Sequence, residues 1–263
     1  MVAGFRRSLS LPGQSLGSSP ARRRGHHLRS ASLPCLSHPA LSRVLDQIRS
    51  SSDHAGLDRI DRLLAALDDL LRLPHAHGAL RRRPTWTDRL LDALLLLADA
   101  HGSFRSVAID LADLRAEARA AVRRSEPTRI ASAARSYRRT EKELLRVAAA
   151  VKGLARSMPP GQWEDAAEAE VAGILTEAVA ATASASAAVF SATASAAAAV
   201  AAAMSKNSPP LWPMRRKASK REREAVEEVP APPIEGLEEG SGRVLRGLIN
   251  IRVSLLNILT PAL

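Results

Sequence analysis

The chain has 263 residues, of which 46% are hydrophobic and only 3% aromatic. Ala and Leu supply most of the apolar content, which predicts helices, because the strands of a mixed α/β enzyme need β-branched and aromatic residues. The single cysteine, Cys35, excludes an intramolecular disulfide. The net charge of +11 is concentrated in two segments that lack base-stacking aromatics, and this weighs against nucleic acid as the partner.

Residues 1–40 form a basic, Ser-rich segment that we predict to be a disordered tail. No acidic residue precedes Asp46, and a segment of low hydrophobicity with charge of one sign cannot offset its ordering entropy. The composition also resembles an organellar transit peptide, although four prolines oppose the amphipathic helix of such a peptide. The first residues contain no continuous apolar stretch, so we expect no secretory signal.

The tail contains the pattern Arg-Ser-x-Ser-x-Pro twice, at residues 7–12 and 29–34. This is the pattern that 14-3-3 proteins bind once its second serine is phosphorylated. A phosphate adds about −1.5 to −2 charge and three acceptor oxygens, which an arginine cluster on a partner binds. We therefore predict phosphorylation of the second serine in each copy, with an unmodified flexible tail as the alternative. The residues that define the two sites are Arg7, Ser10, Pro12, Arg29, Ser32 and Pro34.

Residues 41–204 are expected to form an elongated antiparallel bundle, which with the last helix contains four to five helices. A short helix is expected over residues 41–50 and the first long one over residues 56–73. Apolar residues spaced three and four apart give the long helix a seam of coiled-coil type: Leu57, Ile60, Leu64, Leu67 and Leu71. Pro74 should end it. A basic loop at residues 81–84 should follow, with His75 and His77 as solvated loop residues.

The second long helix is expected over residues 86–124, with Thr85 as its N-cap. Its apolar stripe comprises Leu90, Leu91, Leu94, Leu95, Ala98, Phe104, Val107, Ala108, Leu111 and Leu114. The third helix should begin at Pro127 and end before Pro159. Its exposed face is basic: Arg135, Arg138, Arg139, Lys142 and Arg146. This face is a candidate binding surface for anionic lipid headgroups or an acidic partner, with a solvated helix surface as the alternative.

The fourth helix is expected to begin at about Gln162 and to continue through a tract rich in Ala, Ser and Thr. No charged residue occurs between Glu177 and Lys206. Uncharged length alone suggests a membrane span, but Ala contributes little transfer free energy, and Ser and Thr oppose insertion. We therefore expect a long helix whose small side chains permit close packing, with a membrane span as the alternative.

Residues 205–233 are predicted to be a Pro-rich charged linker, and residues 234–263 to contain a last helix that docks on the bundle. Each fully buried Leu or Ile contributes about 1.5–3 kcal/mol, so a dense apolar terminus should pack rather than face water. Its large apolar residues are Val244, Leu245, Leu248, Ile249, Leu255, Leu256 and Leu259.

Three parts of the sequence resemble a large plant family grouped with BYPASS-type proteins. Residues 243–260 resemble the ending of that family, residues 27–39 its opening, and residues 70–80 its Leu-rich segment. The resemblance implies a predominantly helical protein without known enzymatic activity that is linked to root and shoot development. The middle of the chain departs from the family in its richness in Ala and Arg, so the Ala-Ser-Thr tract has little support from it.

Sequence motifs give no support for catalysis or metal binding. The chain contains no Gly-rich phosphate loop, no HExxH motif and no CxxC pair. Its match to GxSxG, residues 13–17, lies in the Ser-rich segment predicted to be disordered, and not at the turn from a strand to a helix that a nucleophile elbow needs. We therefore expect no enzyme activity, no catalytic, metal or cofactor site and no small-molecule substrate.

The expected function is that of a non-enzymatic scaffold for protein partners, regulated through the tail. The alternative is a peripheral adaptor that binds anionic membrane through its basic segments. We expect a cytoplasmic or membrane-peripheral location. The tail composition makes a plastid an alternative, and basic clusters at residues 22–24 and 215–217 make the nucleus another.

Overall fold

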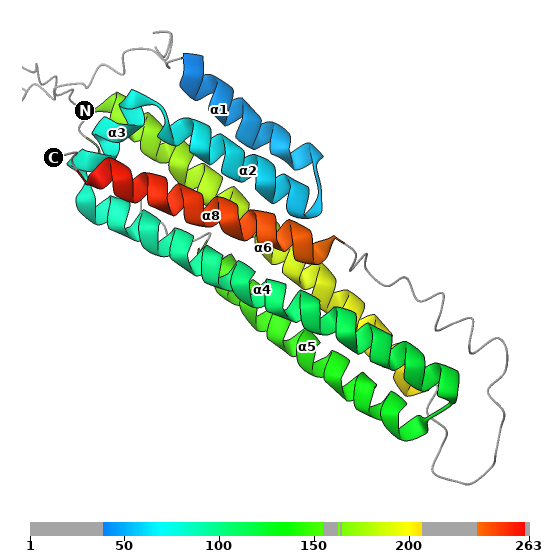
Figure 1. Cartoon of the computed structure of the whole chain (residues 1–263). Coiled ribbons are helices and arrows are strands. Elements are labelled where there is room, and N and C mark those ends of the chain that lie inside the picture. The colour runs from blue at the N-terminus through cyan, green and yellow to red at the C-terminus, as the bar shows by residue number, and fades with distance from the viewer. Residues whose placement is uncertain (1–38, 155–162, 164, 207–235, 261–263) are drawn as a thin grey trace, which may run out of the picture. The chain divides into compact units, whose positions relative to one another are not determined.

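The computed structural model describes residues 39–154, 163, 165–206 and 236–260, and the account below concerns these residues. They form α-helices and one short 3-10 helix, without a strand, which confirms the all-α prediction (Figure 1). All of them belong to the compact unit Ser37–Leu263. The predicted disordered tail and the predicted linker lie almost wholly outside the described residues, so the domain boundaries stay predictions.

The described part of the chain contains seven α-helices where four to five were expected. Their bounds are α1 (Pro39–Ser50), α2 (Gly56–Leu71), α3 (Pro74–Arg82), α4 (Pro84–Arg124), α5 (Pro127–Leu154), α6 (Ala166–Lys206) and α8 (Leu237–Leu259), with the 3-10 helix η1 at Ser51–Asp53.

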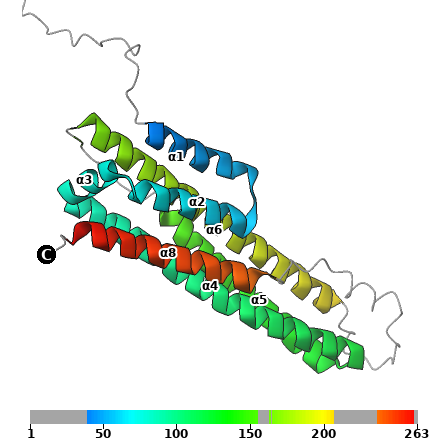
Figure 2. The same cartoon turned by 45° about the horizontal axis from the view of Figure 1, so that its top comes forward.

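Three long helices, α4, α5 and α6, form the body of the bundle, and the other helices pack around one half of it (Figures 1 and 2). The turn between α4 and α5 is short because Ser125 adopts the left-handed conformation, with φ at 54°, and its N–H caps α4. Helix α6 lies against α5 and also contacts α1, α2, α3 and α4.

Helix α8 packs between α2 and α4. It runs in the same direction as α2, because Gly240 meets Leu57 and Gly247 meets Leu64. A Cβ atom on Gly247 would lie 3.0 Å from the Leu64 Cδ1. Glycine therefore allows the α8 backbone to approach the leucine seam of α2. As the heptad spacing predicted, the seam is buried at Ile60, Leu64, Leu67 and Leu71, whereas Leu57 at its start is partly buried.

The size of the buried side chains changes along the bundle. In the half covered by α2 and α8 the core consists of large residues, among them Phe104, Phe190, Leu67 and Leu248. The remainder, which we call the distal arm, comprises residues 113–142 of α4 and α5 and residues 191–206 of α6. Its buried side chains are mostly alanines: Ala118, Ala121, Ala133, Ala134, Tyr137, Thr193, Ala194, Ala197, Ala201 and Met204.

Several local predictions were wrong at helix ends. Of the expected basic loop at 81–84, Arg81 and Arg82 end α3, Pro84 begins α4, and only Arg83 lies between the helices. His75 and His77 lie in α3. Pro74 does end α2, but it also occupies the first turn of α3, where its missing N–H costs nothing. The N-cap position of α4 is Arg83 rather than Thr85, and its side chain makes no capping hydrogen bond. Helix α6 begins at Ala166 and α8 at Leu237, three or four residues later than expected.

Some apolar residues expected in the core face solvent instead. Leu95 on α4 and Ile249 and Leu256 on α8 are exposed. The buried seam of α8 is Val244, Leu248, Ile251, Leu255 and Ile258, spaced four and three residues apart. Helix α8 thus docks through one stripe and leaves a second apolar stripe outside.

Helix α6 is the one described helix that is long and apolar enough to cross a membrane, judged by length and composition. In the bundle its hydroxyl groups bond to its own backbone: Thr182 Oγ1 donates to the Ala178 carbonyl at 2.8 Å, and Thr193 Oγ1 to the Val189 carbonyl at 3.0 Å. Such bonds satisfy a buried hydroxyl within the helix. The Ser- and Thr-rich tract therefore packs in the bundle without unpaired hydroxyl groups at these positions.

Candidate interaction surfaces

The basic face predicted on the third helix lies on α5, and all five of its side chains are exposed. Arg135, Arg139, Lys142 and Arg146 are spaced four, three and four residues apart, so they form one stripe along the helix. Arg138 lies beside the stripe and donates a hydrogen bond from Nη2 to the Ser205 Oγ of α6 at 2.8 Å. The four residues of the stripe make no ion pair within the described residues, so their charge is free to attract an anionic surface.

The two predicted phosphorylation sites lie outside the described residues. The structure therefore reports neither where the tail runs nor what it contacts, and Ser10 and Ser32 stay predictions from the sequence.

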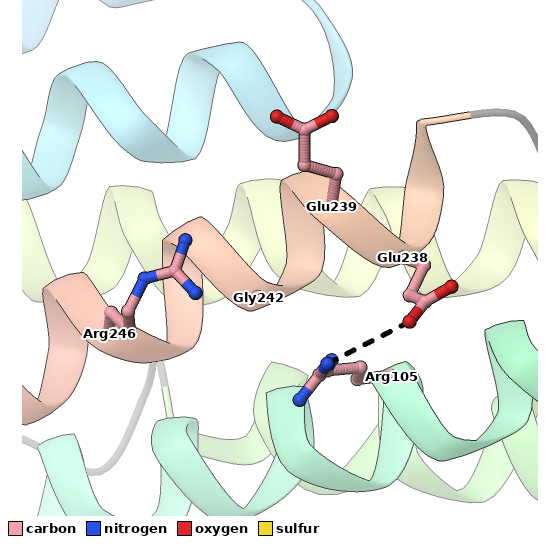
Figure 3. A pocket seen from close by; sticks show the side chains of 5 residues that line it. All are labelled: Arg105, Glu238, Glu239, Gly242 and Arg246. Carbon is pink, nitrogen blue, oxygen red and sulfur yellow. Dashed lines mark ion pairs between the residues drawn. The ribbon is translucent and has the colours of Figure 1, made fainter.

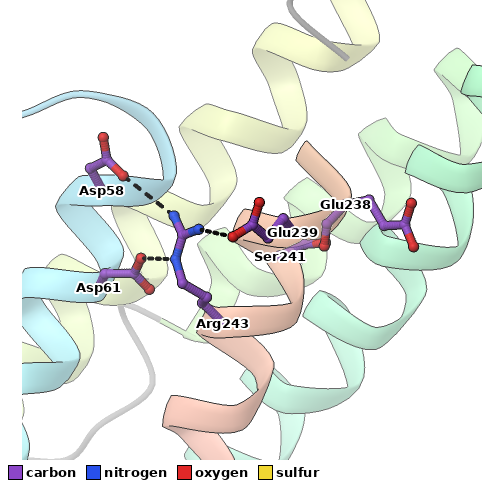
Figure 4. A network of polar contacts seen from close by, with 6 residues as sticks. All are labelled: Asp58, Asp61, Glu238, Glu239, Ser241 and Arg243. Atoms are coloured by element: carbon purple, nitrogen blue, oxygen red, sulfur yellow. Dashed lines mark hydrogen bonds and ion pairs between the residues drawn. The ribbon is translucent and has the colours of Figure 1, made fainter. Parts of the chain in front are cut away.

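A charged network joins the first turns of α8 to α2 (Figure 4). Arg243 donates a hydrogen bond from Nε to Asp61 Oδ2 at 3.2 Å, and its other nitrogens approach Asp58 at 3.7 Å and Glu239 at 3.4 Å. Burial raises the pKa of Asp61, and its hydrogen bond with Arg243 opposes that rise. The bond to Asp61 in turn raises the pKa of Arg243. The network fixes the start of α8 against α2.

A shallow, open pocket of about 280 Å³ lies on the other side of the same turns, between α8 and α4 (Figure 3). Arg105, Glu238, Glu239, Gly242 and Arg246 line it. Arg105 pairs with Glu238 at 3.8 Å. Gly242 leaves a notch between two guanidinium groups, because a Cβ there would lie 3.7 Å from both the Arg105 Nε and the Arg246 Nη1.

Beyond this pocket the outer face of α8 is apolar. Ile249, Val253 and Leu256 are 49%, 48% and 43% exposed. They are spaced four and three residues apart and so lie on one side of the helix. We call these three residues the α8 outer stripe.

A buried polar pair connects α4 to α6 in the core. The His101 Nε2 lies 2.8 Å from the Ser186 Oγ, and Ser186 itself donates to the Thr182 carbonyl at 2.8 Å. The serine hydroxyl thus accepts from an Nε2–H, and the Nδ1 of His101 has no partner. Burial lowers the pKa of His101 to about 4. The sequence offered no signal for this pair, because the two residues meet only when α4 packs on α6.

A second unpredicted polar contact holds α3 against α6. Glu168 is buried, and its Oε1 lies 2.8 Å from the Arg82 Nη1. Among the residues that the structure describes, no group of three or more His, Cys, Asp or Glu side chains is placed to hold a metal ion.

Comparison with known protein families matches residues 56–231 to the family described as Protein BPS1. The match covers more than half of the chain, and the chain therefore belongs to the BPS1 family, as its resemblance to BYPASS-type proteins suggested. Membership relates the protein to plant development without assigning a molecular activity. No curated protein and no solved structure matches the chain.

Proposed function

We propose that the protein is a non-enzymatic helical scaffold that acts in root and shoot development by binding protein partners. The observation that carries the proposal is the bundle itself: α4, α5 and α6 bury a continuous core, while separate basic and apolar stripes face outward on α5 and α8. Such stripes suit docking, and the described residues bring together no metal-binding cluster. We place the protein in the cytoplasm or at a membrane periphery.

Regulation is proposed to act through the tail. Phosphate on Ser10 and Ser32 would create two binding sites for a dimeric 14-3-3 protein on one chain. Two modest sites on one tether bind more tightly than either alone, because the second binding event is intramolecular. Partner binding would then depend on kinase activity.

The test is recovery of the full chain on immobilised 14-3-3 before and after kinase treatment. We expect recovery to depend on phosphorylation and to be lost in the Ser10→Ala/Ser32→Ala double variant. Each single variant should retain weaker binding, because one site remains. A Ser8→Ala/Ser30→Ala variant is the matched control, since it changes the first serine of each copy. Equal recovery of wild type and the Ser10→Ala/Ser32→Ala variant would reject the switch.

The second candidate is a peripheral adaptor on anionic membrane, and the basic stripe of α5 favours it. Arg135, Arg139, Lys142 and Arg146 are exposed on one side of a single helix, so a flat surface can reach all four at once. Each basic residue near an anionic surface contributes about 1 kcal/mol, and salt screens the attraction.

Flotation with vesicles that contain phosphatidylserine separates this candidate from the scaffold. We expect binding at low salt that falls at high salt and in a variant with the four residues of the stripe changed to Gln. The control changes Arg62, Arg89, Arg123 and Arg124 to Gln, which alters net charge equally at other exposed positions. Absence of binding to anionic vesicles at low salt would end the membrane candidate.

A further inference from the structure

We propose that the outer face of α8 is a docking site for an acidic amphipathic helix of a partner protein. The proposal deepens the scaffold function and rests on it, since it names one surface and the chemistry of its occupant. The face runs from the notch at Gly242 to Leu256. It would therefore take a partner helix of about 14 residues, or about 21 Å, at 1.5 Å per residue.

The α8 outer stripe supplies the apolar part of the site. Ile249, Val253 and Leu256 follow the i, i+4, i+7 spacing with which one helix presents apolar anchors to another. The stripe is separate from the buried seam of α8, so the residues that hold α8 on the bundle differ from those left exposed. Covering it would not require α8 to leave its place.

Unpaired positive charge on both sides of the stripe selects an acidic occupant. Arg246 and Arg252 are three residues before and after Ile249, which places them about 60° to either side of it around the helix. Neither arginine forms an ion pair with any residue that the structure describes. The Nε of Arg252 is buried without a hydrogen-bond partner. Carboxylates flanking the apolar anchors of a partner helix would meet the terminal nitrogens of the two guanidinium groups, since the Arg252 Nε itself is covered.

The notch at Gly242 extends the same preference beyond the apolar stripe. Arg105 and Arg246 lie on its two sides, each with a nitrogen 3.7 Å from the position that a Cβ of Gly242 would take (Figure 3). Glu238 is only loosely bound to Arg105, at 3.8 Å. Glu238 and Glu239 line the same pocket, so a partner carboxylate would replace Glu238 at Arg105 and bond to the unpaired Arg246, where charge-assisted hydrogen bonds are strong.

The same charges disfavour a second copy of this face as the occupant. Arg246 and Arg252, the unpaired arginines that flank the stripe on α8, are both positive, so a second α8 would present like charges to them. An acidic helix satisfies the apolar stripe and both arginines together.

The test measures binding of a synthetic helix by fluorescence anisotropy, with the full chain. The probe is an amphipathic peptide of about 18 residues with Leu at four- and three-residue spacing and Glu on either side. We expect binding that weakens at least about tenfold in the Ile249→Gln/Val253→Gln variant, which corresponds to about 1.4 kcal/mol. Leu145→Gln is the control, because Leu145 is an exposed apolar residue on α5.

A variant with reversed charge at Arg246 provides the second part of the test. The variant Arg246→Glu should lose affinity for the Glu peptide and gain affinity for the same peptide with Lys in place of Glu. Circular dichroism and the melting temperature show whether each variant is folded. If the Ile249→Gln/Val253→Gln variant unfolds, the peptide affinities of a folded Arg246→Glu variant still test the docking site. Arg246 is exposed, so its replacement should leave the bundle intact.

The proposal is overturned if the Glu peptide does not bind, or binds wild type and the folded variants equally. It is also overturned if the stripe variant abolishes self-association in sedimentation velocity or vesicle binding in flotation, because the occupant is then a second copy or lipid. Phosphorylation-dependent recovery on 14-3-3 is measured on the same samples. Failure of the peptide with recovery intact rejects only the α8 site.

Discussion

At the scale of single residues, His101 is a buried group whose protonation would destabilise the fold. It packs against the adjacent rings of Phe104 and Phe190, with ring centroids 6.5 and 5.0 Å away. The His101 Nε2–H donates a hydrogen bond to the Ser186 Oγ. A second proton would therefore have to bind to Nδ1, where no hydrogen-bond acceptor is present. Burial of a charge without a partner is costly, and this cost lowers the pKa of His101 to about 4.

The lowered pKa predicts a loss of stability in acid. Above pH 6.5 the histidine is neutral in both states and has no effect. As pH falls from 6.5 towards 4, the unfolded chain binds a proton that the folded chain does not, so the free energy of unfolding falls, by up to about 3 kcal/mol. Urea denaturation between pH 4 and 7 measures this slope. In the His101→Leu variant part of the slope should disappear, and an unchanged slope would contradict the assignment.

A second residue-scale prediction concerns the ion pair of Arg82 with Glu168. The glutamate is 7% exposed, whereas the arginine is 65% exposed. Removing Arg82 leaves a buried carboxylate without its cation, so Arg82→Ala should lower the free energy of unfolding by about 1–3 kcal/mol.

The double variant Arg82→Ala/Glu168→Gln is the control for that loss. It removes the buried charge together with its partner and should recover part of the stability. Chemical denaturation of the four proteins of this cycle gives the coupling energy, and additive losses would show that the pair does not interact.

At the scale of helices, the α5–α6 contact depends on small side chains. Ala194 and Ala201 of α6 are fully or almost fully buried, and they lie eleven and four residues before Ser205, which accepts a hydrogen bond from Arg138 of α5, so they face the same side of α6. Alanine buries little apolar area, but it lets two helix backbones approach closely. The tract rich in Ala, Ser and Thr, for which close packing was expected, therefore supplies a packing surface.

Enlarging one of these alanines tests the packing. Ala194→Leu should destabilise the protein by about 1–3 kcal/mol, because extra carbons in a filled interface force side chains or backbone to shift. Ala192→Leu is the matched control, since Ala192 is exposed two residues away and the two residue types have similar helix propensity. Thermal melting compares the variants, and equal stability of the two would show that the interface has room.

The positions of the helices along the chain could be predicted from the sequence better than which face of each helix is buried. The heptad spacing of α2 identified its buried seam because one stripe dominates. Helix α8 carries two stripes of the same period, one from Val244 to Ile258 and one through Ile249 and Leu256, so periodicity cannot choose between them. Only the position of α8 between α2 and α4 decides which is buried. The His101–Ser186 pair and the Gly242 notch likewise depend on how helices distant in sequence pack.

At the scale of the whole bundle, the covered half and the distal arm differ in what holds them. The first buries Leu, Ile and Phe from five or more helices, and the second buries mostly alanine from three. At about 0.8 kcal/mol for each buried methylene group, a leucine core gains far more than an alanine core of equal length. The arm is also rich in arginine, whose mutual repulsion favours opening.

We therefore predict that α4 does not open as one unit. Native-state hydrogen exchange should show slow amides at residues 90–104 and faster ones at residues 113–123, because the arm opens at a lower free energy than the whole protein. Tyr137 is the largest buried side chain of the arm. Tyr137→Ala should accelerate hydrogen exchange at residues 113–123. Exchange at residues 90–104 should not change, because that part of α4 packs against α8 and α6. Equal protection along α4, or equal acceleration of both segments by the variant, would mean that the alanine-cored arm and the leucine-cored half unfold together.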